Sequence, residues 1–155
     1  MASHEYHALI HWARGTAVFT DNRYSRGHTW RFDGGIEVPA SSSPSVVRPP
    51  LSVEAAIDPE EAFVASLSSC HMLWFLDLAA QAGFTVQAYR DEAEGTLAKN
   101  AAGKLVMTEV VLRPRTSFTG ERRPTPEELA DLHHRAHEEC FIANSVNTRV
   151  TVEGR

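Results

Sequence analysis

The feature that most constrains the fold is a long apolar segment between residues 58 and 83. Aspartate is a favoured helix N-cap, so Asp58 can begin a helix, and Pro59 suits the first helical position. Glu61 then stands at the third helical position, where it can complete a capping box. Gly83 supplies a stop at the other end. The pattern predicts a single helix of about 24 residues that ends near Ala82.

This predicted helix is apolar on nearly every side, so it has almost no face suited to water. Its large apolar residues are Phe63, Leu67, Leu73, Trp74, Phe75, Leu76 and Leu78. A helix with so little polar surface is buried over most of its circumference. One domain of 155 residues has little other chain with which to surround it. We therefore expect a dimer in which the partner subunit covers part of the helix.

The rest of the chain predicts several strands and a second capped helix. The expected strands cover residues 6–12, 28–32, 85–98, 105–114 and 147–153. Thr125, Pro126 and Glu128 repeat the cap pattern and predict a helix from Pro126 to Phe141. Residues 40–50 are rich in serine and proline and predict a loop. The order indicates an α+β fold with an antiparallel sheet, in one domain that spans residues 1–155.

Composition narrows the classes of function. The hydrophobic content of 43% and the charged content of 23% are those of a globular protein. The net charge is −5 and no basic stripe is present, which argues against nucleic acid as a partner. The longest strongly apolar stretch, residues 72–75, is too short to span a membrane. Residues 1–7 lack the basic-then-apolar order of a secretory signal, so we expect a cytoplasmic protein.

The two cysteines, Cys70 and Cys140, are the residues that most directly suggest chemistry. In the cytoplasm a disulfide is more often transient and catalytic than structural. A thiol that attacks a peroxide must be ionised near neutral pH, which needs a positive neighbour or a helix N-terminus. Cys70 is expected in the middle of its helix, so an arginine would have to serve. The candidates Arg23, Arg26 and Arg31 lie near the second strand, and Glu60 could orient one of them through a bidentate pair.

Two other interpretations of the same residues stay open at this point. Buried free cysteines are common packing residues, and 70 positions separate these two in the sequence. Alternatively, His133 and His137 share one face of the second helix. With His71 and the cysteines they could form a His/Cys zinc site.

The motifs around both cysteines resemble those of one known family. Residues 58–63 (DPEEAF), followed by Ser69-Cys70, resemble the first-cysteine stretch of the OsmC/Ohr family, which comprises osmotically inducible protein C and the organic hydroperoxide resistance proteins. Residues 136–140 (AHEEC), followed by Asn144, resemble the second-cysteine motif of the family. Residues 141–143 (FIA) depart from it, because they replace the turn that usually follows this cysteine. The similarity covers about residues 6–153.

The resemblance implies an OsmC-like fold in which the sheets of an intertwined homodimer wrap around the long central helices. It implies a peroxidase that reduces organic hydroperoxides without a bound cofactor. Cys70 would be the peroxidatic thiol, Cys140 the resolving thiol, and Glu60 the partner of a catalytic arginine. That arginine would be Arg31 by similarity to the OsmC branch, or Arg26 by similarity to the Ohr branch. The resulting disulfide would be reduced by a dihydrolipoyl group. The alternatives are an OsmC-fold protein that binds a small hydrophobic ligand without turnover, and the zinc protein.

Overall fold

The computed structural model describes residues 2–155, which divide into two compact units. The N-terminal unit extends to Ala62, and the C-terminal unit comprises Phe63–Arg155. The prediction of one domain over residues 1–155 stays a prediction.

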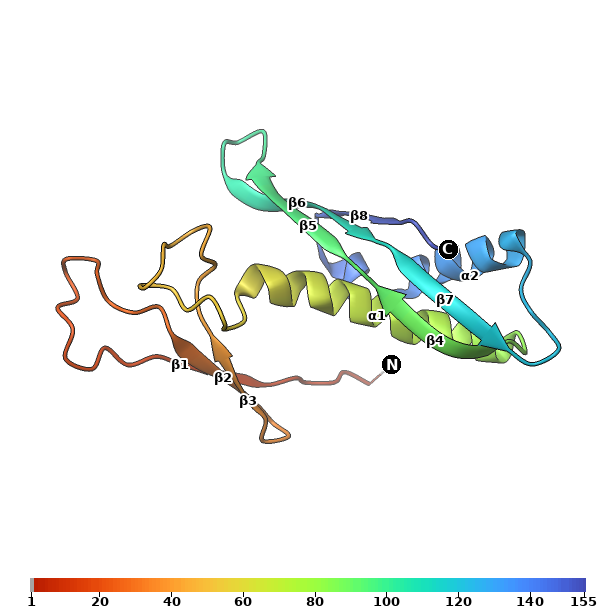
Figure 1. The fold of residues 1–155 in the computed structure, drawn as a ribbon, viewed down its shortest axis with the longest axis horizontal. Coiled ribbons are helices and arrows are strands. Elements are labelled where there is room, and N and C mark those ends of the chain that lie inside the picture. Colours follow the sequence, from red (N-terminus) through yellow and green to blue (C-terminus); the bar gives the residue numbers. More distant parts are fainter. Residues whose placement is uncertain (1) are drawn as a thin grey trace. The chain divides into compact units, whose positions relative to one another are not determined.

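The N-terminal unit contains a small three-stranded antiparallel sheet. Strands β1 (Ala8–His11), β2 (His28–Phe32) and β3 (Glu37–Ala40) pair in the order β1-β2-β3 (Figure 1). All four residues of β1 are exposed, including Leu9 and Ile10. Residues 41–56 form no helix or strand, in agreement with the predicted loop. An apolar strand whose side chains are all exposed lacks the packing partner that normally stabilises a sheet.

Helix α1 (Pro59–Gln81) confirms the strongest prediction from the sequence. The Asp58 side chain accepts a hydrogen bond from the Glu61 amide (2.8 Å), and the Glu61 side chain accepts one from the Asp58 amide (3.1 Å). At the other end Gly83 has a φ of 81°, a left-handed conformation that glycine adopts without strain. The predicted capping box and the predicted glycine stop are both present.

Burial of α1 within one chain is confined to one stripe. The buried residues of α1 are Leu67, His71, Phe75, Leu78 and Ala79. Leu73, by contrast, is 61% exposed. By length and composition α1 could also cross a membrane, a test that core helices of soluble proteins pass as well. The expectation that no segment is long and apolar enough to span a membrane considered residues 72–75 alone. It did not take account of how apolar the whole of α1 is.

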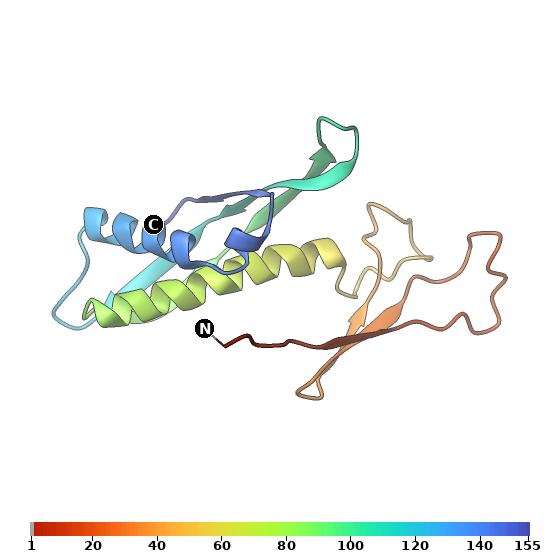
Figure 2. The same cartoon turned by 180° about the vertical axis from the view of Figure 1, so that it is seen from behind.

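The C-terminal unit also contains a long β-hairpin, and α1 and α2 lie side by side along it (Figures 1 and 2). Its strands are β4 (Thr85–Asp91), β5 (Glu94–Lys99), β6 (Leu105–Leu112) and β7 (Pro114–Thr119). β4 pairs with β7, and β5 pairs with β6, both antiparallel. The predicted hairpin is confirmed, but its return strand continues to Thr119 instead of ending at Pro114. A proline is compatible with the first position of a strand, and Pro114 occupies that position in β7.

The last strand, β8 (Arg149–Val152), pairs with β6 in parallel. The expectation of a purely antiparallel sheet is wrong for this pair. The chain reaches β8 from helix α2 (Pro126–Glu139) and the short 3₁₀ helix η1 (Ala143–Ser145), and this crossover allows a parallel pairing.

Helix α2 folds back along α1 and closes the apolar core of the C-terminal unit. Its capping box between Thr125 and Glu128 is formed as predicted. One core cluster joins the two helices and contains Phe75, Leu78, Ala79, Phe84, Leu132 and Ala136. A second contains Leu67, Val110 and Leu112 and joins α1 to the sheet. α2 ends at Glu139, so Cys140 is its C-cap and not a helical residue as predicted.

Candidate functional site

The two cysteine side chains meet where α2 ends beside α1. Cys70 and Cys140 are both free thiols, and their side chains are close enough for the Cys70 thiol to raise the pKa of Cys140. Cys70 is half-buried, whereas Cys140 is only 1% exposed. The sequence left open whether these residues meet, because nothing local in the 69 intervening residues brings them together. The antiparallel return of α2 along α1 does so.

The turn after α2 holds Cys140 in place. The Ala143 amide donates to Cys140 Sγ at 3.4 Å, and the Asn144 amide donates to the Cys140 carbonyl at 3.0 Å. The Phe141 ring packs edge-on against Trp74 of α1 at 5.5 Å between ring centroids. Residues 141–143, which depart from the family pattern, therefore still build an ordered turn behind the second thiol.

The two thiols differ in their surroundings. Burial, and then the hydrogen bond with Cys70, raise the pKa of Cys140 to about 11, so this thiol is protonated near neutral pH. A protonated Cys140 can donate its S–H to Cys70. Cys70 is the more accessible of the two residues. A small electrophile from solvent would therefore meet Cys70 first.

Glu60 belongs to the N-terminal unit, in the first turn of α1. Its Oε2 atom is buried and has no hydrogen-bond partner among residues 2–155. A buried carboxylate oxygen without a partner is costly, whereas a guanidinium beside it would satisfy the charge and the hydrogen bonds. Glu60 is thus suited to hold an arginine.

Arg26 and Arg31, the two arginines that the sequence favours for catalysis, also lie in the N-terminal unit. They differ in the interactions that their side chains make. The Arg26 guanidinium donates to the carbonyls of Asn22 and Tyr24 and lies 3.9 Å from the centre of the Tyr24 ring. Arg31 lies on β2 opposite Leu9 and Glu37 in register, and its side chain makes no hydrogen bond or ion pair with any residue of the described chain. The order of Arg31 before Arg26 stays a prediction. Arg23 is exposed, and its backbone amide bonds to Asp21.

A buried histidine pair one residue away from Cys70 was not predicted as such. His71 Nε2 and His133 Nδ1 lie 3.1 Å apart, and the two residues are 1% and 5% exposed. The His133 ring also stacks on Phe75, with 4.4 Å between ring centroids. Burial lowers the pKa of each histidine to about 4, so both are neutral near pH 7.

The histidines argue against the zinc interpretation. Within residues 2–155, no three histidine, cysteine or acidic side chains are arranged to hold a metal ion. His71 and His133 bond to each other instead of pointing at a common centre. The sequence did contain a signal that these histidines are buried, because His71 lies within the apolar stretch of α1 and His133 follows Leu132. Histidines in such positions are more often core residues that hydrogen-bond each other.

Comparison with known proteins adds a family to this geometry. A sequence model described as OsmC-like protein matches residues 52–154. The structure matches an OsmC-like protein of unknown function from Vibrio cholerae with 55% sequence identity and a TM-score of 0.97, over 99% of this chain and 100% of the other. No curated protein matches the chain.

Two more distant structures share the fold. An organic hydroperoxide resistance protein from Elizabethkingia anophelis matches with 17% identity and a TM-score of 0.72, over 99% of this chain and 95% of that one. The organic hydroperoxide resistance protein OhrB of Bacillus subtilis matches with 16% identity and a TM-score of 0.68, over 98% of each chain. At such low identity these likenesses establish the α+β fold alone.

Proposed function

Because the chain belongs to the OsmC-like protein family, we propose that it is a thiol-dependent peroxidase that reduces organic hydroperoxides to alcohols. The observation that supports this proposal most directly is the contact between the Cys70 and Cys140 side chains. A half-buried thiol beside a buried thiol provides the two sulfurs that a disulfide-forming peroxidase needs. The organic hydroperoxide resistance proteins among the structural matches support organic hydroperoxides as the class of substrate.

The reaction proceeds in two steps on the protein. The Cys70 thiolate attacks one oxygen of the hydroperoxide, the O–O bond breaks, and the alcohol leaves after taking up a proton. Cys70 is thereby oxidised to a sulfenic acid. The Cys140 sulfur then attacks the Cys70 sulfur, a disulfide forms, and the proton of Cys140 leaves with the hydroxide as water. Because the two thiols lie close together, disulfide formation is favoured over further oxidation of Cys70.

Arg31 is the arginine that we assign to the attack, and Arg26 is the second choice. A guanidinium stays protonated at every relevant pH and presents several donors. It can stabilise the attacking thiolate and donate to the oxygen that leaves. Glu60, whose Oε2 is buried without a partner, would orient this guanidinium through a bidentate pair.

The active form that we propose is an intertwined homodimer. β1 is exposed along its whole length, and Leu73 on α1 is 61% exposed. Apolar residues in such number on two elements are typical of surfaces that a partner covers. A second copy of the chain would bury them.

Regeneration of the thiols requires an external dithiol. We propose a dihydrolipoyl group, carried by a lipoylated protein or as dihydrolipoamide, which reduces the Cys70–Cys140 disulfide and becomes a cyclic disulfide. We place the cycle in the cytoplasm, where such reductants keep thiols reduced.

One experiment tests the thiol chemistry directly. The reduced protein is treated with one equivalent of cumene hydroperoxide and analysed by thiol titration and by mass spectrometry of its peptides. The proposal expects loss of both free thiols, a peptide pair joined through Cys70 and Cys140, and one equivalent of cumyl alcohol. Binding of the peroxide with both thiols intact would favour the alternative of an OsmC-fold protein that binds hydrophobic ligands without turnover.

A further inference from the structure

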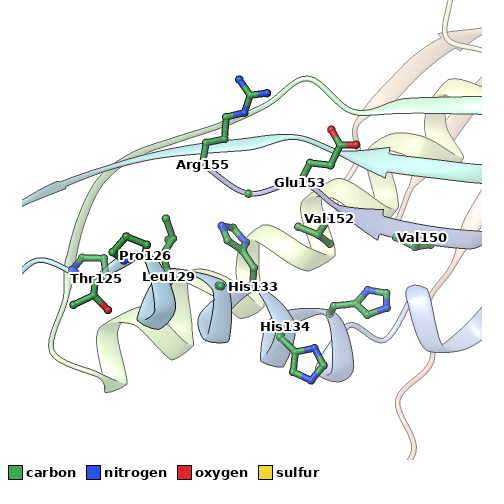
Figure 3. A pocket seen from close by; sticks show the side chains of 13 residues that line it. Thr125, Pro126, Leu129, His133, His134, Val150, Val152, Glu153 and Arg155 are labelled. Carbon is green, nitrogen blue, oxygen red and sulfur yellow. The ribbon is translucent and has the colours of Figure 1, made fainter.

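Arginines gather on the face of the β4–β7 sheet that points away from the helices. Tyr89 packs on Phe75 of α1, with 5.5 Å between ring centroids, so Tyr89 faces the core. Successive side chains of a strand point to opposite faces, and the next residue, Arg90, therefore lies on the outer face. On the C-terminal segment, Glu153 and Arg155 also point away from α2 (Figure 3). This outer face is separate from the two thiols, which meet where α2 ends beside α1.

Three of these arginines form a row across three adjacent segments. Arg90 of β4 pairs in register with Arg115 of β7. The Arg155 amide donates to the Pro114 carbonyl (2.9 Å), and the Thr116 amide donates to the Arg155 carbonyl (3.1 Å). These two bonds follow the pattern of a parallel ladder and place Arg155 directly beside Arg115. Directly opposed like charges destabilise a sheet, so the row repels itself unless a negative group joins it.

The carboxylates near this row pair with only some of the arginines. The ion pairs are Arg90–Glu92 at 2.7 Å, Arg113–Glu94 at 3.2 Å and Arg113–Glu153 at 3.2 Å. Within residues 2–155, by contrast, no carboxylate forms an ion pair with the side chain of Arg115 or Arg155. Two guanidinium groups that lie side by side are therefore left without a counter-charge.

A small cavity opens among these side chains on the outer face. Its volume is about 60 Å³, and its lining consists of Arg90, Glu92, Arg113, Arg115, Glu153 and Arg155. This volume is far below the roughly 300–1,000 Å³ typical of sites that enclose a whole small molecule, so the cavity fits one small charged group. The arginines of the lining outnumber its glutamates, which favours an anion.

The charge of the site and the shape of its donors indicate which anion fits. A guanidinium is planar and presents a fork of donors that matches the oxygens of a carboxylate or a phosphate. A phosphate monoester carries about −1.5 to −2 charges at pH 7, whereas a carboxylate carries one. Two neighbouring guanidinium groups without counter-charges match the larger charge of the phosphate.

We propose that Arg115 and Arg155, assisted by Arg90, bind the phosphate group of a phosphate monoester on the outer face of the sheet. The two guanidinium groups donate to the phosphate oxygens, and the bound charge relieves the repulsion along the row. The rest of the ligand lies outside the cavity. This site is separate from the thiols, so it does not depend on the peroxidase activity.

Binding is tested by adding glycerol 1-phosphate to the full-length protein at pH 7.5, while sodium chloride holds the ionic strength constant. The ¹H–¹⁵N resonances of the arginine Nε groups report the contact. The expected result is a saturable shift of the Arg115 and Arg155 resonances. Acetate, which has one charge, should bind at least about tenfold more weakly, the value of one hydrogen bond to a charged group.

Two glutamine variants locate the binding site. Arg115→Gln removes one of the two unpaired guanidinium groups and should weaken binding by at least about tenfold. Because this change also removes repulsion between like charges, the variant should melt at the same temperature as the wild-type protein, or a higher one, in phosphate-free buffer. Arg123→Gln removes the same charge from an exposed position that does not line the cavity, and it should leave binding unchanged.

Vesicles show whether the phosphate group belongs to a lipid. Co-sedimentation with phosphatidylcholine vesicles that contain phosphatidic acid, lost in Arg115→Gln, would assign the site to a lipid headgroup. Binding of glycerol 1-phosphate alone would assign it to a soluble ester. The proposal is overturned if glycerol 1-phosphate causes no saturable shift, or if acetate binds as tightly. It is also overturned if Arg115→Gln retains the wild-type affinity, or if Arg123→Gln weakens binding as much as Arg115→Gln does.

Discussion

Two polar pairs join the same two helices in the C-terminal unit, and they differ in their access to solvent. Cys70 meets Cys140 at the end of α2, where one partner is half-buried. His71, the next residue of α1, meets His133 in the interior, where both are at least 95% buried. Neighbouring positions on a helix face directions about 100° apart, so one step in sequence separates the half-buried thiol from a core contact. The pair that we propose as reactive has one partner in reach of solvent, whereas both histidines are buried between the helices.

The largest effects are expected at the thiol pair. Cys70→Ser should lower peroxide consumption by about a thousandfold or more, because a hydroxyl of ordinary pKa does not replace a thiolate. Cys140→Ser should allow one attack and then stall with Cys70 as sulfenic acid or a higher oxide. Consumption of cumene hydroperoxide with dihydrolipoamide as donor measures both.

Ser69→Ala, an exposed change beside Cys70, is the matched control and should keep the wild-type rate. Sustained cycling of Cys140→Ser would contradict the resolving role of Cys140. Turnover retained in Cys70→Ser would remove the distinction between the two pairs, because the reactive group would then lie elsewhere.

The histidine pair should appear in the pH dependence of stability. The folded protein holds the pKa of His71 and His133 near 4, while the unfolded chain has the ordinary value of about 6.5. The unfolded state therefore takes up protons first as the pH falls. The contribution of the two neutral histidines to the free energy of unfolding is fully present above pH 6.5. It declines as the pH falls towards 4, by up to about 3 kcal/mol for each histidine. Urea unfolding at pH 7.5, 5.5 and 4.5 measures the decline.

A double variant isolates this contribution from other titrating groups. His71→Leu/His133→Leu replaces both partners with apolar groups of similar size, a change that can be nearly neutral. In this variant the free energy of unfolding should fall less between pH 6.5 and pH 4 than in the wild-type protein. His134→Leu changes an exposed histidine of the same helix and should leave the decline as it is. An unchanged slope in the double variant would show that the pair does not govern the acid sensitivity.

Asp91 links the sheet to the turn of α1 that precedes the thiol. Its carboxylate accepts hydrogen bonds from the Ser68 hydroxyl (2.5 Å) and the Arg113 amide (2.6 Å). Asp91→Asn leaves one acceptor oxygen for two donors, so it should lower the free energy of unfolding by about 1–3 kcal/mol. Chemical denaturation at pH 7.5 measures the loss.

Asp77→Asn is the control for this change, because Asp77 is an exposed acid of α1 whose carboxylate accepts a hydrogen bond from Gln81. It should alter stability by less than about 0.5 kcal/mol. Equal losses in the two variants would show that Asp91 has no special role in fastening α1.

The sequence predicted elements whose signals are local. The capping residues Asp58 and Thr125 predicted where the two helices begin. Turn residues indicated the hairpin of β5 and β6. The parallel pairing of β8 with β6 could not be predicted, because register between distant strands depends on the crossover and not on local propensity. The contact of Cys70 with Cys140 has the same origin. The pairing of His71 with His133 was not predicted, because spacing on one helix says nothing about a partner on another.

The smallest effect that we predict concerns the cation for the thiol. Arg31→Ala should slow the alkylation of Cys70 by iodoacetamide at pH 7, by up to about tenfold, because a positive neighbour favours the thiolate. The rate constant of alkylation measures it. Arg26→Ala is the comparison, since the Arg26 side chain already bonds to Asn22 and Tyr24 within its own loop and should change this rate less. The opposite order would assign the role to Arg26. No change in either variant would mean that Cys70 reacts without help from the N-terminal unit. In that case the accessibility of Cys70 to solvent would be the property that makes the thiol pair reactive. The same property distinguishes the thiol pair from the buried histidine pair.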